Sequence, residues 1–195
     1  MTLSVPTRQS GYALGNRNAA VQIEVFLDIQ CPFSKKAWPV LMEICDTFPD
    51  DEVGVTVQMM VLANHRQAWD MTRLVHAICA GDAARFRRFA TFLYDQQERF
   101  FNGPFADKTH PDLLNFAVEI TREWDAAETD VAARMERDEA YLQTRIPIRH
   151  AARRGVWSTP TYFVNDVEAT TVGSSTAFTE WKTTLEALLA NPGGS

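Results

Sequence analysis

Two strand-like runs near the start of the chain, with a helical pattern between them, constrain the fold most. Residues 21–28 (VQIEVFLD) and 53–62 (VGVTVQMMVL) are short, apolar and rich in β-branched residues, which is typical of buried strands. Between these runs, apolar residues recur at the spacing of one helical face, at Ala37, Val40, Leu41, Ile44 and Phe48. A strand, a helix and a second strand in this order predict a right-handed βαβ unit.

A long helical pattern follows over residues 65–153. Apolar residues keep helical spacing in three stretches, at residues 71–79, 86–93 and 113–124. Residues 100–111 contain a glycine and two prolines, so we expect a loop there that includes His110. Residues 131–142 hold no helix breaker, and the helical character fades near Ile146 and Pro147.

The last part of the chain returns to strand patterns and then ends in a helix. Residues 161–164 favour a strand, Asn165 and Asp166 a tight turn, and residues 167–172 a return strand. A final helical face holds Phe178, Trp181, Leu185, Leu188 and Leu189. The whole order predicts an α/β fold, with one mixed β-sheet flanked by helices. Residues 1–64 and 154–195 would form the sheet domain, and residues 65–153 an inserted all-helical subdomain.

Composition excludes several classes of protein. The 195 residues carry a net charge of −6, which gives no general attraction to nucleic acid or anionic membranes. Three cysteines are too few for a disulfide-dense scaffold. No window has the roughly 18 apolar residues of a membrane span. The first 15 residues lack a basic start and an apolar run, and the end (NPGGS) matches no retention tag, so we expect a cytoplasmic protein.

Cys31 has the most reactive setting of the three cysteines. It follows a predicted strand and directly precedes a predicted helix, whose amide groups and dipole stabilise a thiolate. Lys35 and Lys36 add positive charge in the first turn, and Ser34 offers the sulfur a hydroxyl or a backbone N–H. A buried cysteine that serves only as a small apolar side chain is the alternative.

Three motifs in order resemble the DsbA-like thioredoxin-fold family. The first runs from Ala13-Leu14-Gly15-Asn16 through the strand to Cys31-Pro32-Phe33-Ser34, where the family has a Cys-Pro-aromatic-Cys motif. The second, at residues 155–165 (GVWSTPTYFVN), resembles the segment around the family's cis-proline. The third is Pro39, eight residues after Cys31, where thioredoxin-like helices commonly carry a kinking proline. The resemblance spans nearly the whole chain and implies a thioredoxin-like sheet with an inserted helical domain.

The resemblance also implies roles for individual residues. Cys31 matches the nucleophilic cysteine, and Ser34 stands at the second position of the catalytic motif. Pro160 matches the cis-proline and Thr159 the residue before it, whose backbone faces the nucleophile. Substrate would be bound by four residues, Pro32, Phe33, Thr159 and Pro160.

Two departures from the family pattern affect the chemistry. Ser34 replaces the second cysteine, which in a dithiol enzyme breaks the mixed disulfide. Cys45 cannot replace it, since 14 helical residues span about 21 Å and a disulfide needs Cα atoms within about 7 Å. Cys45 and Cys79 fall on apolar helical faces, which favours core packing. Thioredoxins also carry a buried acid six residues before the nucleophile, where this chain has Val25, with Glu24 one residue away on the other strand face.

Three functions remain open from the sequence. The first is a monothiol thiol–disulfide exchanger in which Cys31 attacks protein or small-molecule disulfides and an external thiol such as glutathione, a co-substrate and not a bound cofactor, resolves the adduct. The second is a non-catalytic peptide- or glutathione-binding module. The third is a kappa-type glutathione transferase or isomerase, against which the cysteine at the nucleophile position argues, since those relatives carry serine there.

Other polar residues have weaker functional patterns. His65 with Arg66 suits a helix cap or the surface better than a substrate contact, and His76 suits a structural role. A basic patch of His150, Arg153 and Arg154 could receive a glutathione carboxylate, although a solvated helix end is the simpler interpretation. No metal-ligand spacing and no phosphate-binding loop is present in the sequence, so we expect no metal.

Overall fold

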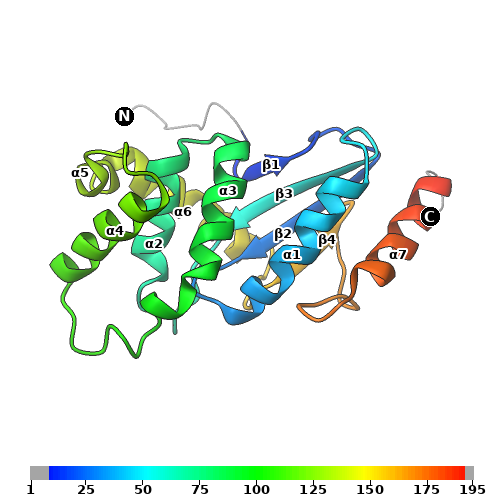
Figure 1. Cartoon of the computed structure of the whole chain (residues 1–195). Coiled ribbons are helices and arrows are strands. Elements are labelled where there is room, and N and C mark those ends of the chain that lie inside the picture. Colours follow the sequence, from blue (N-terminus) through cyan, green and yellow to red (C-terminus); the bar gives the residue numbers. More distant parts are fainter. Residues whose placement is uncertain (1–8, 192–195) are drawn as a thin grey trace, which may run out of the picture.

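The computed structural model describes residues 9–191, and these form one mixed five-stranded sheet with helices around it (Figure 1). The strand order is β1-β3-β2-β4-β5. Residues 1–8 and 192–195 lie outside the described residues. They include part of the two chain ends that were read for targeting signals, and the outermost parts of the predicted sheet domain.

The βαβ unit predicted from the sequence is confirmed. Strand β2 (Val21–Leu27) runs parallel to β3 (Val53–Met59), and α1 (Pro32–Thr47) connects them. A short strand β1 (Tyr12–Leu14) pairs antiparallel with the outer edge of β3. β3 ends at Met59, earlier than the predicted residue 62, because the chain turns after one more backbone bond, from Met60 N–H to the Leu27 carbonyl.

The C-terminal strands complete the sheet on the other side of β2. Strand β4 (Thr161–Val164) pairs antiparallel with β2, and β5 (Val167–Glu168) pairs with β4. Asn165 and Asp166 form the predicted turn, both with positive φ. The return strand is shorter than the predicted residues 167–172, because after one more backbone bond, from Ala169 N–H to the Tyr162 carbonyl, the chain turns and Val172 N–H bonds to the Ala169 carbonyl.

Helices lie between β3 and β4 in the sequence and gather at one end of the sheet (Figure 1). They are α2 (Ala68–Cys79), α3 (Ala83–Asp95), a 3₁₀ turn η1 (Gln97–Phe100), α4 (His110–Trp124), α5 (Val131–Met135) and α6 (Asp138–Arg153). The last helix, α7 (Phe178–Ala190), packs beside α1 on one face of the sheet. The fold is the expected thioredoxin-like sheet with a helical insertion.

The structure corrects three sequence predictions inside the helical segment. Residues 131–142 do not form one helix, because Arg137 is extended and the acidic first turn of α6 starts a new helix at Asp138. α6 does not end near Pro147, which instead lies on its buried face at helical spacing with Ala140, Thr144 and Ala151. His110 is the first residue of α4, which begins with a capping box between Thr109 and Asp112.

The two faces of β2 are buried against different parts of the molecule. Ile23, Val25 and Leu27 belong to the main core, which includes α1 residues and Trp181 of α7. Phe26 on the opposite face packs with Ala151 of α6, Val156 and Phe163. Val25, at the position where thioredoxins carry a buried acid, is fully buried in this main core.

Candidate active site

Cys31 is the N-cap of α1, at the turn that follows β2. Its backbone is extended, Pro32 is the first helical residue, and the Cys31 carbonyl accepts a bond from Lys35 N–H. Proline suits this position because its fixed φ fits a helix start and its missing N–H needs no partner. The thiol therefore lies at the positive end of the helix dipole, which favours the thiolate.

The loop before β4 places a carbonyl against the Cys31 sulfur. The Thr159–Pro160 peptide bond is cis, as the resemblance implied. The Cys31 thiol donates a hydrogen bond to the Thr159 carbonyl oxygen over 3.4 Å, although the two residues are 128 positions apart in the sequence. This carbonyl is an acceptor and so favours the protonated thiol, opposing the helix dipole.

The predicted substrate-binding residues surround this contact. Thr159 is buried at 6 % exposure, whereas Phe33 is 60 % exposed directly beside the helix start. Trp157, two residues before Thr159, is 87 % exposed and was not selected from the sequence. Large exposed aromatic side chains are typical of surfaces that bind other molecules.

Ser34 is completely buried and contacts the backbone of Asp28. Its hydroxyl oxygen accepts a hydrogen bond from Asp28 N–H over 3.1 Å. The sequence suggested that Ser34 offers the sulfur its hydroxyl or its backbone N–H; in the structure the hydroxyl oxygen joins the end of β2 to the first turn of α1. The hydroxyl hydrogen is not used in that bond and stays available as a donor.

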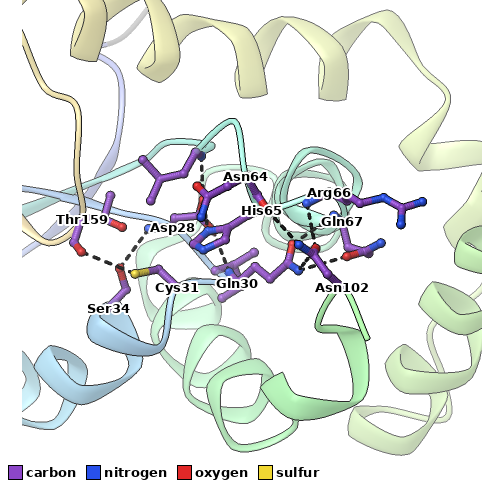
Figure 2. Close-up of polar contacts among 12 residues, drawn as sticks. Asp28, Gln30, Cys31, Ser34, Asn64, His65, Arg66, Gln67, Asn102 and Thr159 are labelled. Carbon is purple, nitrogen blue, oxygen red and sulfur yellow. Dashed lines mark hydrogen bonds and ion pairs between the residues drawn. The ribbon is translucent and has the colours of Figure 1, made fainter. Parts of the chain in front are cut away.

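A buried carboxylate–histidine pair lies next to Cys31 (Figure 2). Asp28 is 0 % exposed, and its carboxylate lies 3.0 Å from Nδ1 of His65, whose side chain is 14 % exposed. The interpretation of His65 as a cap or surface residue is wrong, because Gln67 is the N-cap of α2 and His65 contacts Asp28. A carboxylate three residues before a reactive cysteine was the available signal, but only folding brings His65 to it.

Hydrogen bonds from amide side chains connect the turn around Cys31 to the helical segment (Figure 2). Gln97 of η1 donates from Nε2 to the carbonyls of both Ile29 and Cys31, over 2.9 and 3.0 Å. Gln30 donates to Gln67 and to Asn102, over 3.0 and 2.9 Å. The sequence did not single out these residues, since their partners are 37 to 72 positions away.

The other two cysteines have different surroundings from Cys31. Cys79 is buried in α2 and Cys45 is half-buried in α1, both beside the main core. Burial raises the pKa of the Cys79 thiol to about 12 and that of Cys45 to about 11. Both therefore stay protonated near neutral pH, in agreement with a packing role.

The remaining basic candidates lie in internal contacts. His150 Nε2 is 2.9 Å from the Glu24 carboxylate, and Arg154 also contacts Glu24 and Asp166. The predicted basic patch is thus partly neutralised: His150 and Arg154 pair with carboxylates, so these two residues do not form the solvated helix end that the sequence favoured. His76 contacts the Tyr12 hydroxyl over 2.8 Å, a structural role.

The described residues 9–191 contain no cluster of three or more histidine, cysteine or acidic side chains suited to a metal ion. Within the same residues, no helix is both long and apolar enough to cross a membrane.

The fold and the thiol site define a thioredoxin-fold protein with a helical insertion. A family model described as thioredoxin matches residues 7–187, and the chain belongs to this family. No curated protein matches the chain.

Solved structures of DsbA-like proteins share the fold. A candidate protein-disulfide isomerase from Pseudomonas syringae is 20 % identical, with a TM-score of 0.76 over 90 % of this chain and 97 % of that one. The catalytic domain of Proteus mirabilis ScsC is 18 % identical, with a TM-score of 0.68 over 94 % and 92 %. The thiol-disulfide exchange protein alpha-DsbA2 from Wolbachia pipientis is 15 % identical, with a TM-score of 0.67 over 91 % and 87 %. At these identities the likeness is one of fold.

Proposed function

We propose that the protein is a monothiol thiol–disulfide oxidoreductase in which Cys31 is the nucleophile. The observation that carries this proposal is the position of Cys31 as the N-cap of α1, in contact with the Thr159 carbonyl and with Ser34 at the second position of the motif. The family and the names of several structural relatives support a role in thiol–disulfide exchange.

Exchange proceeds in two balanced steps. The Cys31 thiolate attacks one sulfur of a disulfide R–S–S–R′, a mixed disulfide with R forms, and R′–S⁻ leaves. A thiolate from solution, such as that of glutathione, then attacks the substrate sulfur, releases the Cys31 thiolate and leaves a disulfide of R with glutathione. This second step needs an external thiol, so the proposal suits the reducing cytoplasm expected from the sequence.

Internal resolution has no partner in the chain. Ser34 cannot attack a disulfide, and Cys45 lies 14 residues further along the sequence, near the opposite end of α1. That separation corresponds to about 21 Å of helix, far beyond the reach of a disulfide. Cys79 is buried within α2.

A glutathionylated model peptide tests the proposal. We expect the wild-type chain to form a discrete glutathione or peptide adduct at Cys31, visible by intact-mass spectrometry and removed by added glutathione. Cys31→Ser should abolish the adduct and Cys45→Ser should keep it. In Ser34→Cys, an internal disulfide between Cys31 and the introduced thiol should replace the long-lived adduct. Turnover that survives Cys31→Ser would overturn the proposal.

The second candidate is a binding module that does no chemistry. It is favoured by the 3 % exposure of Cys31 and by the bond from its thiol to Thr159. This candidate predicts peptide binding that is equal in the wild-type chain and Cys31→Ser, with no alkylation of Cys31 by iodoacetamide at neutral pH. Rapid alkylation would reject it.

A further inference from the structure

The Asp28 carboxylate is buried completely and is held by three donors. Its Oδ1 accepts from Gln30 N–H over 2.7 Å, and its Oδ2 accepts from Leu62 N–H over 2.7 Å and contacts His65 Nδ1 at 3.0 Å. Two of these donors are neutral amides, and only His65 can bring a positive charge. A buried carboxylate is costly unless it is paired and hydrogen-bonded, so the charge of His65 matters to this site.

Asp28 is joined to the Cys31 site through the backbone at two points. Its carbonyl accepts from Cys31 N–H over 3.0 Å, which closes a turn, and its N–H donates to Ser34 in the first turn of α1. In such a turn the Cα atoms of the first and fourth residues lie within about 7 Å. The Asp28–His65 pair therefore lies close enough to Cys31 for a change in its charge to alter the electrostatic potential at the sulfur.

We propose that His65, held by Asp28, is a positioning residue that sets the charge beside Cys31 and thereby the fraction of Cys31 present as thiolate. With His65 protonated the pair is neutral. With His65 neutral, the Asp28 negative charge is unbalanced and opposes the thiolate. This inference rests on the proposed function, because Cys31 is the reacting thiol. The Asp28–His65 pair would take the place of the buried acid that thioredoxins carry at the position of Val25.

The other titratable groups near this site do not reproduce the proposed effect of the His65 charge. Burial raises the pKa of Tyr94 on α3, with the charges of Asp28 and Cys31 adding to it, and burial raises that of Tyr162 on β4, so both phenols stay neutral. Lys35 and Lys36 of α1 and Asp95 of α3 line a pocket between these two helices, and neither Asp28 nor His65 lines it. Arg66 points away from Cys31 in Figure 2.

The test is the pH dependence of iodoacetamide alkylation at Cys31. In His65→Gln the side chain still offers Asp28 a hydrogen bond but carries no charge. We expect the midpoint of the profile to rise by about one unit, and the rate below the midpoint to fall about tenfold. The rate at high pH should be unchanged, and the two profiles should converge where wild-type His65 loses its proton.

Two further variants test the direction of the midpoint shift and whether it is specific to the Asp28–His65 pair. Asp28→Asn removes the negative charge and should shift the midpoint in the opposite direction. His150→Gln removes a second histidine that contacts a carboxylate and should leave the profile unchanged. A His65→Gln profile identical to the wild type, or shifts of equal sign in His65→Gln and Asp28→Asn, would overturn the inference.

A measurement that needs no substitution at the pair keeps the inference testable should these variants fail to fold. Coupling between two sites is reciprocal, so the state of Cys31 must move the pKa of His65. Nuclear magnetic resonance titration should show a lower His65 pKa after Cys31 is alkylated than when it is free. An unchanged His65 titration would contradict the inference, whereas failure of disulfide exchange would contradict only the proposed function.

Discussion

Two carboxylate–histidine pairs lie along the same strand and differ in their surroundings. In the pair at the end of β2, next to Cys31, Asp28 is fully buried and the His65 side chain is 14 % exposed, whereas Glu24 with His150 lies at a partly open pocket on the α6 side of the sheet. Burial opposes ionisation of Glu24, but hydrogen bonds from His150 and Gln58, with the charges of His150 and Arg154, hold its pKa below the usual range. The Glu24 pair thus has several compensating groups, while Asp28 has one compensating charge.

The same two residue types lie in a structural contact at one place and, in our proposal, set the charge beside Cys31 at another. What separates the two pairs is access to water and distance from Cys31. Substitutions at each pair therefore test how burial and distance from Cys31 determine its role.

The largest effect is expected from Asp28→Ala. This change leaves two buried amides and the His65 imidazole without their acceptor, and removing one member of a buried pair costs about 3–5 kcal/mol. Urea unfolding followed by circular dichroism measures the loss. Asp46→Ala is the control, because Asp46 pairs with Arg87 on the surface and should cost under about 1 kcal/mol. Equal losses in the two variants would remove the distinction between buried and exposed acids.

Ser34→Ala should have the next largest effect. The buried Asp28 N–H would lose its acceptor, and an unsatisfied buried donor costs about 1–3 kcal/mol. Ser34→Thr, which keeps a hydroxyl, serves as the comparison in the same unfolding experiment. A stability loss in Ser34→Ala no greater than in Ser34→Thr would mean that the hydroxyl contact is unimportant.

Glu24→Gln should destabilise the fold by about 1 kcal/mol at pH 7, by replacing a charged acceptor with a neutral one. The Glu24 pKa is lowered in the folded state, so its contribution is fully present above its unfolded value of about 4.5. That contribution is lost as the pH falls through the folded pKa. Unfolding at a series of pH values should show the variant and the wild type converging in acid, and a constant difference would contradict the ionised pair.

The smallest effect is expected from Asp166→Asn. The Asp166 side chain is 91 % exposed, so water screens its contact with Arg154. The change should cost under about 0.5 kcal/mol in thermal unfolding. A larger loss of stability would show that Arg154 needs its contact with Asp166 in order to pair with Glu24. The exposed contact would then contribute to the stability of the Glu24–His150 pair.

Much of the fold could be predicted from local patterns. β2, α1, β3 and β4 come from apolar runs and helical spacing, which depend on neighbours in sequence. The failures share a cause: α6 continues through Pro147, which is buried on its packed face, and β5 ends where the chain turns at Ala169 and Val172, which pack against the core. Packing of this kind overrides the local preferences of single residues, and it depends on partners distant in sequence.

The sequence by itself determined the candidate nucleophile of this protein, because a cysteine that follows a strand and precedes Pro32 and a helix lies at the positive end of the helix dipole. It also determined that Ser34 replaces a second thiol. Only the tertiary structure decided what surrounds Cys31, since Thr159 lies 128 residues away, His65 is 37 residues from Asp28, and Gln97 is 66 residues from Cys31. These contacts depend on how the helical segment closes against the end of the sheet.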